Sequence, residues 1–499
     1  MNIKQAKEQL KQTVRAYLSR DEYGDWTIPL VAQRPVLLMG PPGIGKTAIA
    51  HQAAQECGVA MVAYSITHHT RQSAIGLPSI RTGSFDGKEF QVTEYTMSEI
   101  IASVYKEMEK TGLRQGILFL DEINCVSETL APAMLQFLQC KTFGSHQVPE
   151  GWVIVAAGNP PEYNRSVREF DIVTLDRVRR IDIDEDFPSW KEYAYQRKVH
   201  PAILSYLDIK PSHFYKIETT VDGRRFVTAR GWEDLSRFLT ACEGLDIPVD
   251  ESVVGQFLQL PAVAKDFANY LDLYKKYQTD YKVEEILTGT FRDSTLRRLR
   301  EAPFDERLSA ISLLLDGVFT ACAAANEEDA FVTELHSGLK QIMAALPAAA
   351  RWEEPFQTVS ESLSQVLEAQ RATGNLEKTA ERRKVRVLDT LDGYRQALRT
   401  GDVSISDQAA EALRTQFSAA VARRREAILD ASARLDNAFS FLEAAFGESQ
   451  ELVIFLTELT MNCYSMRFIR DNGCEKYSQY NQSLLLGGRQ RSILDEIGG

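Results

Sequence analysis

The residues from Gly40 to Ala48 have the types and spacing of a loop that binds phosphate. In order they are Gly40, Pro41, Pro42, Gly43, Ile44, Gly45, Lys46, Thr47 and Ala48. They lie between an apolar run and a segment of helical composition, which is the context that the G-x-x-x-x-G-K-[ST] pattern requires. Glycines let backbone N–H groups turn toward phosphate oxygens, and the helix adds the positive end of its dipole. We therefore expect a nucleotide here, with Lys46 at its β- and γ-phosphates and the Thr47 hydroxyl on Mg²⁺.

Two carboxylates follow the next strongly apolar run, Gly116 to Leu120: Asp121 and Glu122. Open α/β sheets bind ligands at the carboxyl ends of their strands, so we expect this pair beside the phosphate loop. Asp121 suits a direct or water-mediated hold on Mg²⁺, and Glu122 suits the polarisation of an attacking water. The pair favours hydrolysis over transfer to a second substrate. The alternative is an acidic pair that simply faces solvent.

A polar amide follows a third apolar run. Asn159 and Pro160 come directly after Val153 to Gly158. The Asn159 amide could position the same water near the γ-phosphate. Taken alone, an Asn before Pro is as readily explained as a turn former. The succession of loop, acidic pair and amide, each after an apolar run, favours the first interpretation.

A parallel sheet would bring these residues together. Short β-rich apolar runs alternate with helical segments at Pro35 to Met39, Ala60 to Tyr64, Gly116 to Leu120 and Trp152 to Ala157. Such runs predict parallel strands that are buried on both faces by crossover helices. We expect an α/β doubly wound P-loop core in residues 1–186, a mainly helical lid in residues 187–247, and a mainly α-helical C-terminal region in residues 248–499.

Long helices are expected in the C-terminal region. Between Ser406 and Phe446 apolar residues recur at steps of three, four or seven, and no Pro or Gly interrupts them. A similar helix is expected from Glu354 to Arg399, with Thr400-Gly401-Asp402 as the turn between the two. The pattern therefore predicts a long helical hairpin near residues 354–446.

The segments GPPGIGKT, GILFLDEIN, VIVAAGNPPE and TLDRVRR together resemble the MoxR branch of the AAA+ ATPases. The resemblance covers roughly residues 1–245. It implies ATP hydrolysis with Mg²⁺ between the subunits of a homo-oligomeric ring, expected to be a hexamer. It also implies that Lys46 and Thr47 belong to Walker A, Asp121 and Glu122 to Walker B, and Asn159 to sensor 1.

Arginines complete such sites. By the resemblance, Arg177 would be the finger that projects into the ATP site of a neighbouring subunit, although Val178 stands where the family usually has Phe. Arg179 and Arg180 are close enough in sequence that either could take this role instead. Arg230 matches the family's sensor 2 arginine near the start of a lid helix.

Two hairpins are predicted between these motifs. Asp86-Gly87 lies between short β-prone runs within Ser79 to Val92, which is a strong hairpin signal. A second, shorter hairpin is expected between Cys140 and Trp152. By the resemblance both would face the central pore of a ring. Phe85, Phe90 and His146 either grip a partner there or pack the hairpins on the core.

Composition narrows the class of protein. The net charge of −12 provides no overall basic field for a polyanion. The seven cysteines are scattered singly, which indicates reduced thiols. No signal-peptide layout is present at the start, and no uninterrupted apolar run has the roughly 20 residues needed to span a bilayer. We expect a cytoplasmic protein. His68-His69 has no further metal-ligating residues nearby, so a surface or packing role is favoured.

The leading hypothesis for function is an ATP-driven, chaperone-like remodeller of a protein partner. MoxR-type ATPases commonly act with a partner that carries a von Willebrand factor A domain, which the resemblance implies here. The alternative is a nucleic-acid-directed motor of a restriction or defence system, like McrB. The clusters Arg382-Arg383-Lys384 and Arg423-Arg424-Arg425 keep that alternative open, although such clusters are more often solvated helix faces.

Overall fold

The computed structural model describes residues 1–67, 76–143, 146–163, 170–220, 223–349, 351–372, 376–400 and 406–482. The chain divides into two compact units. The first consists of Met1–Trp190, Thr228–Gly231 and Arg371–Asn375, and the second of Lys191–Val227, Trp232–Gln370 and Leu376–Gly499.

The first unit is built on a parallel sheet of five strands in the order β2-β5-β8-β1-β9. The strands are β1 (Val36–Met39), β2 (Ala60–Ser65), β5 (Gly116–Asp121), β8 (Trp152–Gly158) and β9 (Arg179–Asp182). The predicted α/β fold class is confirmed, and the four predicted strands lie within one or two residues of their expected bounds. The phosphate loop leaves the sheet at the end of β1, which pairs with β8 on one side and β9 on the other.

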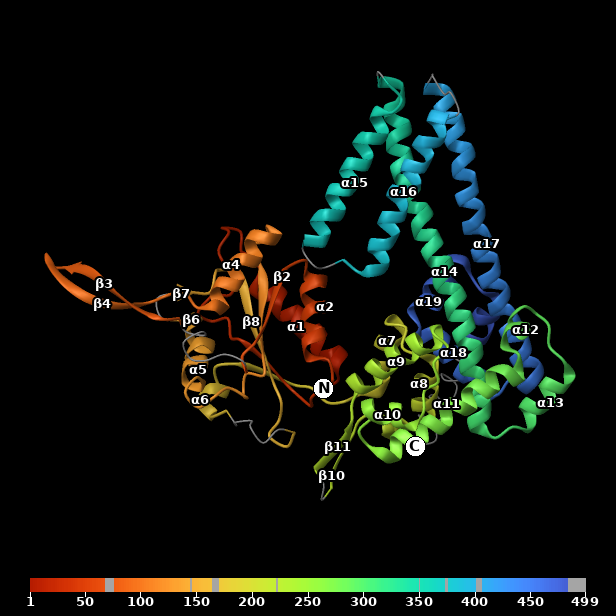
Figure 1. The fold of residues 1–499 in the computed structure, drawn as a ribbon, viewed down its shortest axis with the longest axis horizontal. Coiled ribbons are helices and arrows are strands. Elements are labelled where there is room, and N and C mark those ends of the chain that lie inside the picture. Colours follow the sequence, from red (N-terminus) through yellow and green to blue (C-terminus); the bar gives the residue numbers. More distant parts are fainter. Residues whose placement is uncertain are drawn as a thin grey trace, which may run out of the picture. The chain divides into compact units, whose positions relative to one another are not determined.

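Helices of the first unit flank this sheet (Figure 1). They are α1 (Ile3–Tyr17), α2 (Lys46–Cys57), α4 (Glu99–Thr111), α5 (Ala131–Cys140) and α6 (Ile172–Leu175), and α7 (Phe187–Gln196) begins in this unit. The helix that carries the site, α2, buries Ile49, Ala50, Ala53 and Ala54. Small alanines at helical spacing let α2 pack closely on its neighbours, which holds its first residue, Lys46, at the end of the sheet.

The predicted hairpins are both present. The longer one joins β3 (Pro78–Phe85) to β4 (Lys88–Tyr95) in the register Gly83↔Phe90, with positive φ at Asp86 and Gly87. It extends away from the sheet (Figure 1), and Ile80 and Phe90 are 72% and 50% exposed. The shorter one joins β6 (Thr142–Phe143) to β7 (His146–Gln147), and His146 Nε2 lies 3.1 Å from the Tyr95 carbonyl oxygen. The side chain of Phe85 and residues His68-His69 lie outside the described parts.

The second unit starts with elements that follow the expected mainly helical pattern. They are the rest of α7, α8 (Pro201–Ile209), the 3-10 turn η1 (Pro211–His213), most of α9 (Ala229–Gly244), α10 (Glu251–Phe257), α11 (Pro261–Tyr281), α12 (Val283–Leu287) and α13 (Asp293–Glu301). The pattern missed one feature, a short antiparallel hairpin of β10 (Lys216–Thr220) and β11 (Gly223–Val227).

Long helices make up the rest of the second unit: α14 (Phe304–Ala345), η2 (Leu346–Ala348), α15 (Glu354–Ala372), α16 (Lys378–Thr400), α17 (Ser406–Phe446), α18 (Gln450–Met461) and α19 (Cys463–Asn472). The bounds of α17 match the prediction. The expected single helix from Glu354 to Arg399 is wrong, because it is divided into α15 and α16. The sequence between them contains Gly374-Asn375, a turn-favouring pair that the prediction overlooked.

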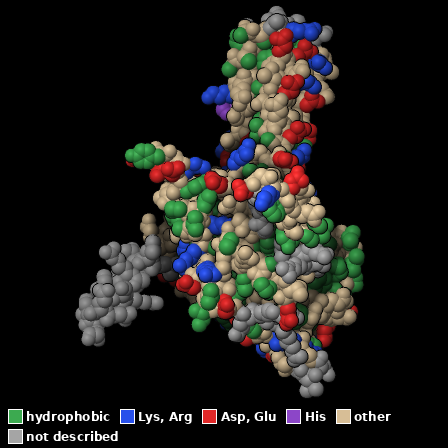
Figure 2. Space-filling model, turned by 90° about the vertical axis from the view of Figure 1, so that its left-hand side faces the viewer, with side chains coloured by type: hydrophobic (Ala, Val, Ile, Leu, Met, Phe, Trp, Pro, Cys, Tyr) green, Lys and Arg blue, Asp and Glu red, His purple; other side chains and the backbone are tan. Residues whose placement is uncertain are grey.

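Four of these helices form an arm, in which α14, α15, α16 and α17 run alternately up and down (Figure 1). Its core contains Phe331 and Leu335 of α14, Phe356 of α15, Leu391 of α16 and Leu413 of α17. Acidic and basic side chains are interspersed along the face of the arm that Figure 2 shows.

The stretch Phe304–Ala348 is the one helical segment of the described chain that is long and apolar enough to cross a membrane by length and composition. Half of its most apolar part is buried within the protein. Ile311, Leu314 and Val318 of this stretch lie in a core with α17 and α18. Core helices pass the same test, so its apolar character is explained by packing.

Candidate active site

The phosphate loop folds at the carboxyl end of β1. Its first residue, Gly40, donates its N–H to the Gly158 carbonyl oxygen at 3.4 Å, which ties the loop to the end of β8. Gly43 and Gly45 have φ of +77° and +98°, a backbone conformation that residues with a Cβ rarely adopt. Gly45 is the N-cap of α2 and supplies no side-chain cap. The loop therefore leads into a helix whose N-terminal end can meet an anion.

Lys46, the first residue of α2, is buried. Its ammonium donates hydrogen bonds to the carbonyl oxygens of Gly40 and Pro41 at 2.7 and 2.8 Å and to Asn159 Oδ1 at 2.9 Å. Burial lowers the pKa of Lys46 to about 8, and the charge of Arg230 acts in the same direction. A bound triphosphate would supply negative charge that favours the protonated lysine.

Thr47 and Asp121 lie together, as the prediction of a shared metal site requires. Thr47 Oγ1 donates to Asp121 Oδ2 at 2.9 Å, while Asp121 Oδ1 accepts the Glu122 N–H at 3.0 Å. A hydroxyl and a carboxylate oxygen are the hard ligands that Mg²⁺ prefers, so this pair fits the metal. Mg²⁺ bound to a nucleotide there would neutralise phosphate charge, and Thr47 and Asp121 would hold it.

Glu122 follows Asp121 in a left-handed backbone conformation, with φ of +56°. A turn begins here, since the Cys125 N–H donates to the Glu122 carbonyl oxygen at 2.9 Å. The carboxylate of Glu122 is close enough to Lys46 to raise its pKa, against the effect of burial. The structure thus brings Glu122, Asp121 and Lys46 to one edge of the sheet.

Asn159 occupies the position expected of it, next to Lys46 at the end of β8. Its neighbour Asn124, which none of the sequence predictions included, is 3% exposed. Asn124 Nδ2 donates to the Asn159 carbonyl oxygen at 2.8 Å, and Asn124 Oδ1 accepts the Asn159 N–H at 3.3 Å. Its sequence signal was an amide in an otherwise apolar stretch, Ile123 to Val126, directly after the acidic pair.

Residues 36–176 match the model of the ATPase family associated with various cellular activities, AAA. This range contains the phosphate loop, the acidic pair and Asn159, which the structure brings together. Residues 36–176 form an AAA ATPase domain. This domain implies ATP hydrolysis, the reaction that the acidic pair predicted, and members of this family bind ATP with Mg²⁺.

Two solved structures are similar to part of this chain. A putative ATPase from Cytophaga hutchinsonii is 15% identical and covers 39% of this chain and 50% of its own, with a TM-score of 0.25. A point mutant of RuvB from Thermotoga maritima is 17% identical and covers 42% of this chain and 52% of its own, also with a TM-score of 0.25. The chain thus spans about half the length of either structure, and these scores support no further argument. A search among curated proteins found no match.

Arg230 lies beside the phosphate loop of the AAA ATPase domain, at the start of α9. A Cβ placed on Gly43 would be 3.2 Å from Thr228 Oγ1 and 3.5 Å from Arg230 Cβ. Thr228 was not predicted, and it fixes this approach by accepting the Gly231 N–H at 3.3 Å. The Arg230 guanidinium is exposed and acts on the pKa of Lys46, so its charge is available to a nucleotide in the same site.

The three candidate finger arginines follow the matched range 36–176 and have different surroundings in the first unit. Arg179 and Arg180 are in β9: the first donates to Thr13 Oγ1 at 2.8 Å, and the second pairs with Asp182 at 2.8 Å. Arg177 lies just after α6 and is exposed. Its side chain forms no hydrogen bond or ion pair with another described residue.

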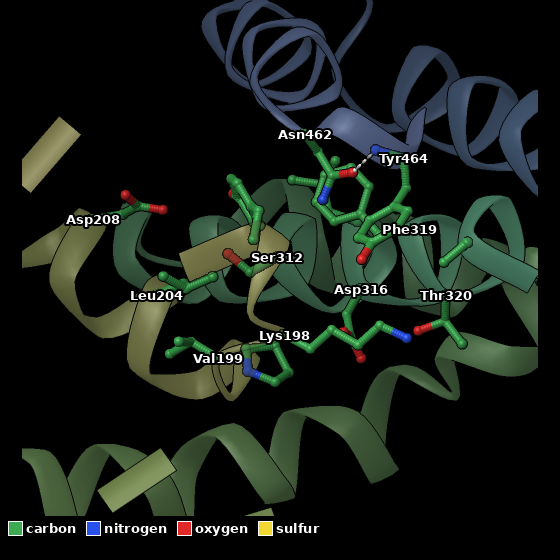
Figure 3. A pocket seen from close by; sticks show the side chains of 14 residues that line it. Lys198, Val199, Leu204, Asp208, Ser312, Asp316, Phe319, Thr320, Asn462 and Tyr464 are labelled. Carbon is green, nitrogen blue, oxygen red and sulfur yellow. Dashed lines mark hydrogen bonds between the residues drawn. The ribbon is translucent and has the colours of Figure 1, made fainter. Parts of the chain in front are cut away.

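Outside the AAA ATPase domain, the second unit contains a cavity of about 160 Å³ between α8, α14 and the start of α19 (Figure 3). Its lining combines apolar Leu204 and Phe319 with Lys198, Asp208 and Asp316. Asp208 also accepts hydrogen bonds from the buried Lys191 at 2.7 and 2.8 Å, and Lys191 contacts Glu458 at 2.6 Å. Asp208 is thus already paired inside the unit.

Proposed function

We propose that the protein is a MoxR-type AAA+ ATPase that assembles into a hexameric ring and uses ATP hydrolysis to remodel a protein partner. The main support for assembly into a ring is the environment of Arg177. Arg177 is exposed beside Ile172 and Val173, whose exposed fractions are 84% and 56%. Arg177 has no hydrogen bond or ion pair with another described residue and follows these exposed apolar residues along the chain, which suits a contact with a second subunit, because a cation there could stabilise charge in the neighbour's transition state.

The long hairpin supports a protein partner. Ile80, Phe90 and Leu77 are between 50% and 72% exposed on or beside β3–β4. Exposed apolar side chains on a projecting ribbon suit transient contacts with a polypeptide, since both the side chains and the strand edges can bind one. We therefore assign the gripping role to Phe90. His146 is assigned to support of the ribbon, because it contacts the backbone of Tyr95.

The basic clusters of the arm do not favour nucleic acid. Arg383 pairs with Glu327 and Glu334 at 2.8 and 2.9 Å, and Arg424 pairs with Asp329 at 2.6 Å. These acidic residues belong to α14, so part of each cluster is neutralised within the arm. A nucleic-acid site needs cations that remain available to phosphates. The McrB-like alternative therefore has no specific observation in its favour.

Sedimentation velocity with a slowly hydrolysed ATP analogue tests the ring. We expect a species of hexamer size, and ATPase activity per subunit should rise with protein concentration. A monomer with full, concentration-independent activity would contradict the proposal. Double- and single-stranded DNA should leave the ATPase rate unchanged, and stimulation by DNA would favour the motor hypothesis instead.

The finer identity of the partner rests on the MoxR resemblance alone. The partner to add to the ATPase assay would be a von Willebrand factor A domain protein encoded beside this one. A rise in ATP turnover that is lost when Phe90 is replaced would support this protein as the partner. We propose a cytoplasmic location, which the single, scattered spacing of the seven cysteines in the sequence supports.

A further inference from the structure

Asn124 connects two parts of the site that come from different strands. It follows the acidic pair at the end of β5, and its carboxamide holds both the N–H and the carbonyl oxygen of Asn159 at the end of β8. A carboxamide that donates and accepts in this way replaces the pair of bonds that a neighbouring strand would make. The backbone of Asn159 is therefore fixed relative to the turn that carries Glu122.

The space for this contact is provided by Gly158. A Cβ on Gly158 would lie 2.8 Å from Asn124 Oδ1 and 3.0 Å from Met39 Sδ, so a larger residue would push the carboxamide away. The Gly158 carbonyl oxygen also accepts the N–H of Gly40, the first residue of the phosphate loop. The acidic turn, Asn159 and the phosphate loop thus meet at this one glycine.

We propose that Asn124 is a positioning residue for ATP hydrolysis, which holds the Asn159 amide at the correct distance from Lys46 and Glu122. The inference rests on the proposed role of Asn159. Asn124 is buried and bonded on both sides of its carboxamide, so it acts on the reaction through Asn159. An amide displaced by about 1 Å would still allow nucleotide binding but would align the attacking water poorly.

The test compares turnover and binding in Asn124→Ala. We expect kcat to fall about 10- to 100-fold while the Kd for a fluorescent ATP analogue stays within about twofold. Asn326→Ala is the matched control, because Asn326 is also a buried amide, which donates to the Tyr464 carbonyl oxygen at 2.8 Å in the second unit. The control should lower the melting temperature without changing kcat.

A double-mutant cycle separates positioning from a general structural effect. If Asn124 acts through Asn159, the kcat of Asn124→Ala/Asn159→Ala should equal that of Asn159→Ala. Losses that multiply would overturn the inference, as would an Asn124→Ala variant with unchanged kcat. An Asn159→Ala variant with normal kcat would instead remove the proposed role of Asn159 itself.

Gly158→Ala provides a second approach that keeps the chemistry of Asn124 intact. It should reduce kcat to a similar extent, and the effect should largely disappear in the Asn124→Ala background, where the clashing carboxamide is absent. Normal kcat in folded Gly158→Ala protein would count against the inference even if Asn124→Ala failed to fold.

Discussion

Lys46 in the nucleotide site and Lys191 in the second unit are both buried, with exposed fractions of 8% and 4%. Lys191 contacts two carboxylates, Asp208 at 2.7 Å and Glu458 at 2.6 Å. Lys46 instead donates to neutral oxygens, and its pKa is lowered to about 8 by burial. The charge of Lys191 is used within the fold, whereas that of Lys46 is available to an anionic ligand. Substitution of Lys191 should therefore mainly affect stability, and substitution of Lys46 should mainly affect ATP binding.

The largest effect should come from Arg177, which has no hydrogen bond or ion pair with another residue of the described chain. Arg177→Ala should reduce kcat by about three to five orders of magnitude with little change in ATP affinity, because its charge would serve the transition state in a neighbouring subunit. The matched control is Arg179→Ala, which loses the bond to Thr13 and should mainly lower stability. Steady-state ATPase assays and melting curves separate the two.

Mixing experiments decide whether Arg177 acts in trans. Arg177→Ala and Lys46→Ala subunits, each inactive alone, should recover some activity together, because an intact phosphate loop can then sit beside an intact Arg177. If that mixture stays inactive while one with Arg179→Ala or Arg180→Ala recovers, the wrong arginine has been chosen, although the trans mechanism would stand.

Glu122→Gln should have the next largest effect on the rate of ATP hydrolysis. The amide keeps the shape of the side chain but cannot polarise water as the carboxylate does, so kcat should fall by about two to four orders of magnitude. ATP binding, measured by equilibrium titration, should persist. Turnover close to that of the unaltered protein would show that Glu122 is not the catalytic carboxylate.

Lys191→Met should show the opposite behaviour. It leaves Asp208 and Glu458 close together without their counter-ion, which should reduce the free energy of unfolding by about 3 to 5 kcal/mol. Urea denaturation measures this loss. Most of it should be recovered in Lys191→Met/Asp208→Asn/Glu458→Gln, because no unpaired buried charge remains. Lys46→Ala is the comparison: it should weaken ATP binding without loss of stability.

The smallest effect concerns pH. The pKa of Lys46 is about 8 in the free protein and should be higher when phosphate charges are bound, so ATP binding takes up a proton above pH 8. Affinity should be constant below that pH and fall by up to about tenfold per pH unit above it. Titration calorimetry across this range would measure the change. In Lys46→Arg the side chain stays charged, and a similar decline there would assign it to another group.

The sequence predicted the site better than the region that surrounds it. Asp121, Glu122 and Asn159 stand at the ends of apolar strands, and Lys46 and Thr47 open the helix that follows β1 and its loop. Strand order alone brings the ends of such strands together. Thr228 could not be found in this way, because its role depends on the close approach of chain segments distant in sequence. Asn124 follows the acidic pair, but its partner Asn159 could not be read from the sequence.

The arm shows the same limit. The cluster Arg382-Arg383-Lys384 is basic when viewed along the chain. In the structure, Glu327 and Glu334 of α14 lie against Arg383, so part of this positive charge is neutralised within the arm. Helical periodicity predicts that a helix forms, but it does not identify the neighbour that will neutralise its charges.

The projecting hairpin also has a consequence for how the protein behaves at high concentration. Within the described chain, β3 and β4 pair only with each other, so each leaves an unpaired edge. Open edges beside exposed apolar residues such as Ile80 can template aggregation. The ribbon carries the charged residues Arg81, Lys88, Glu89 and Glu94, and stacking of one ribbon on another would have to remove such side chains from water at a cost. Its resistance to aggregation should therefore depend on these charged side chains, and replacing them with uncharged ones should promote precipitation through this ribbon.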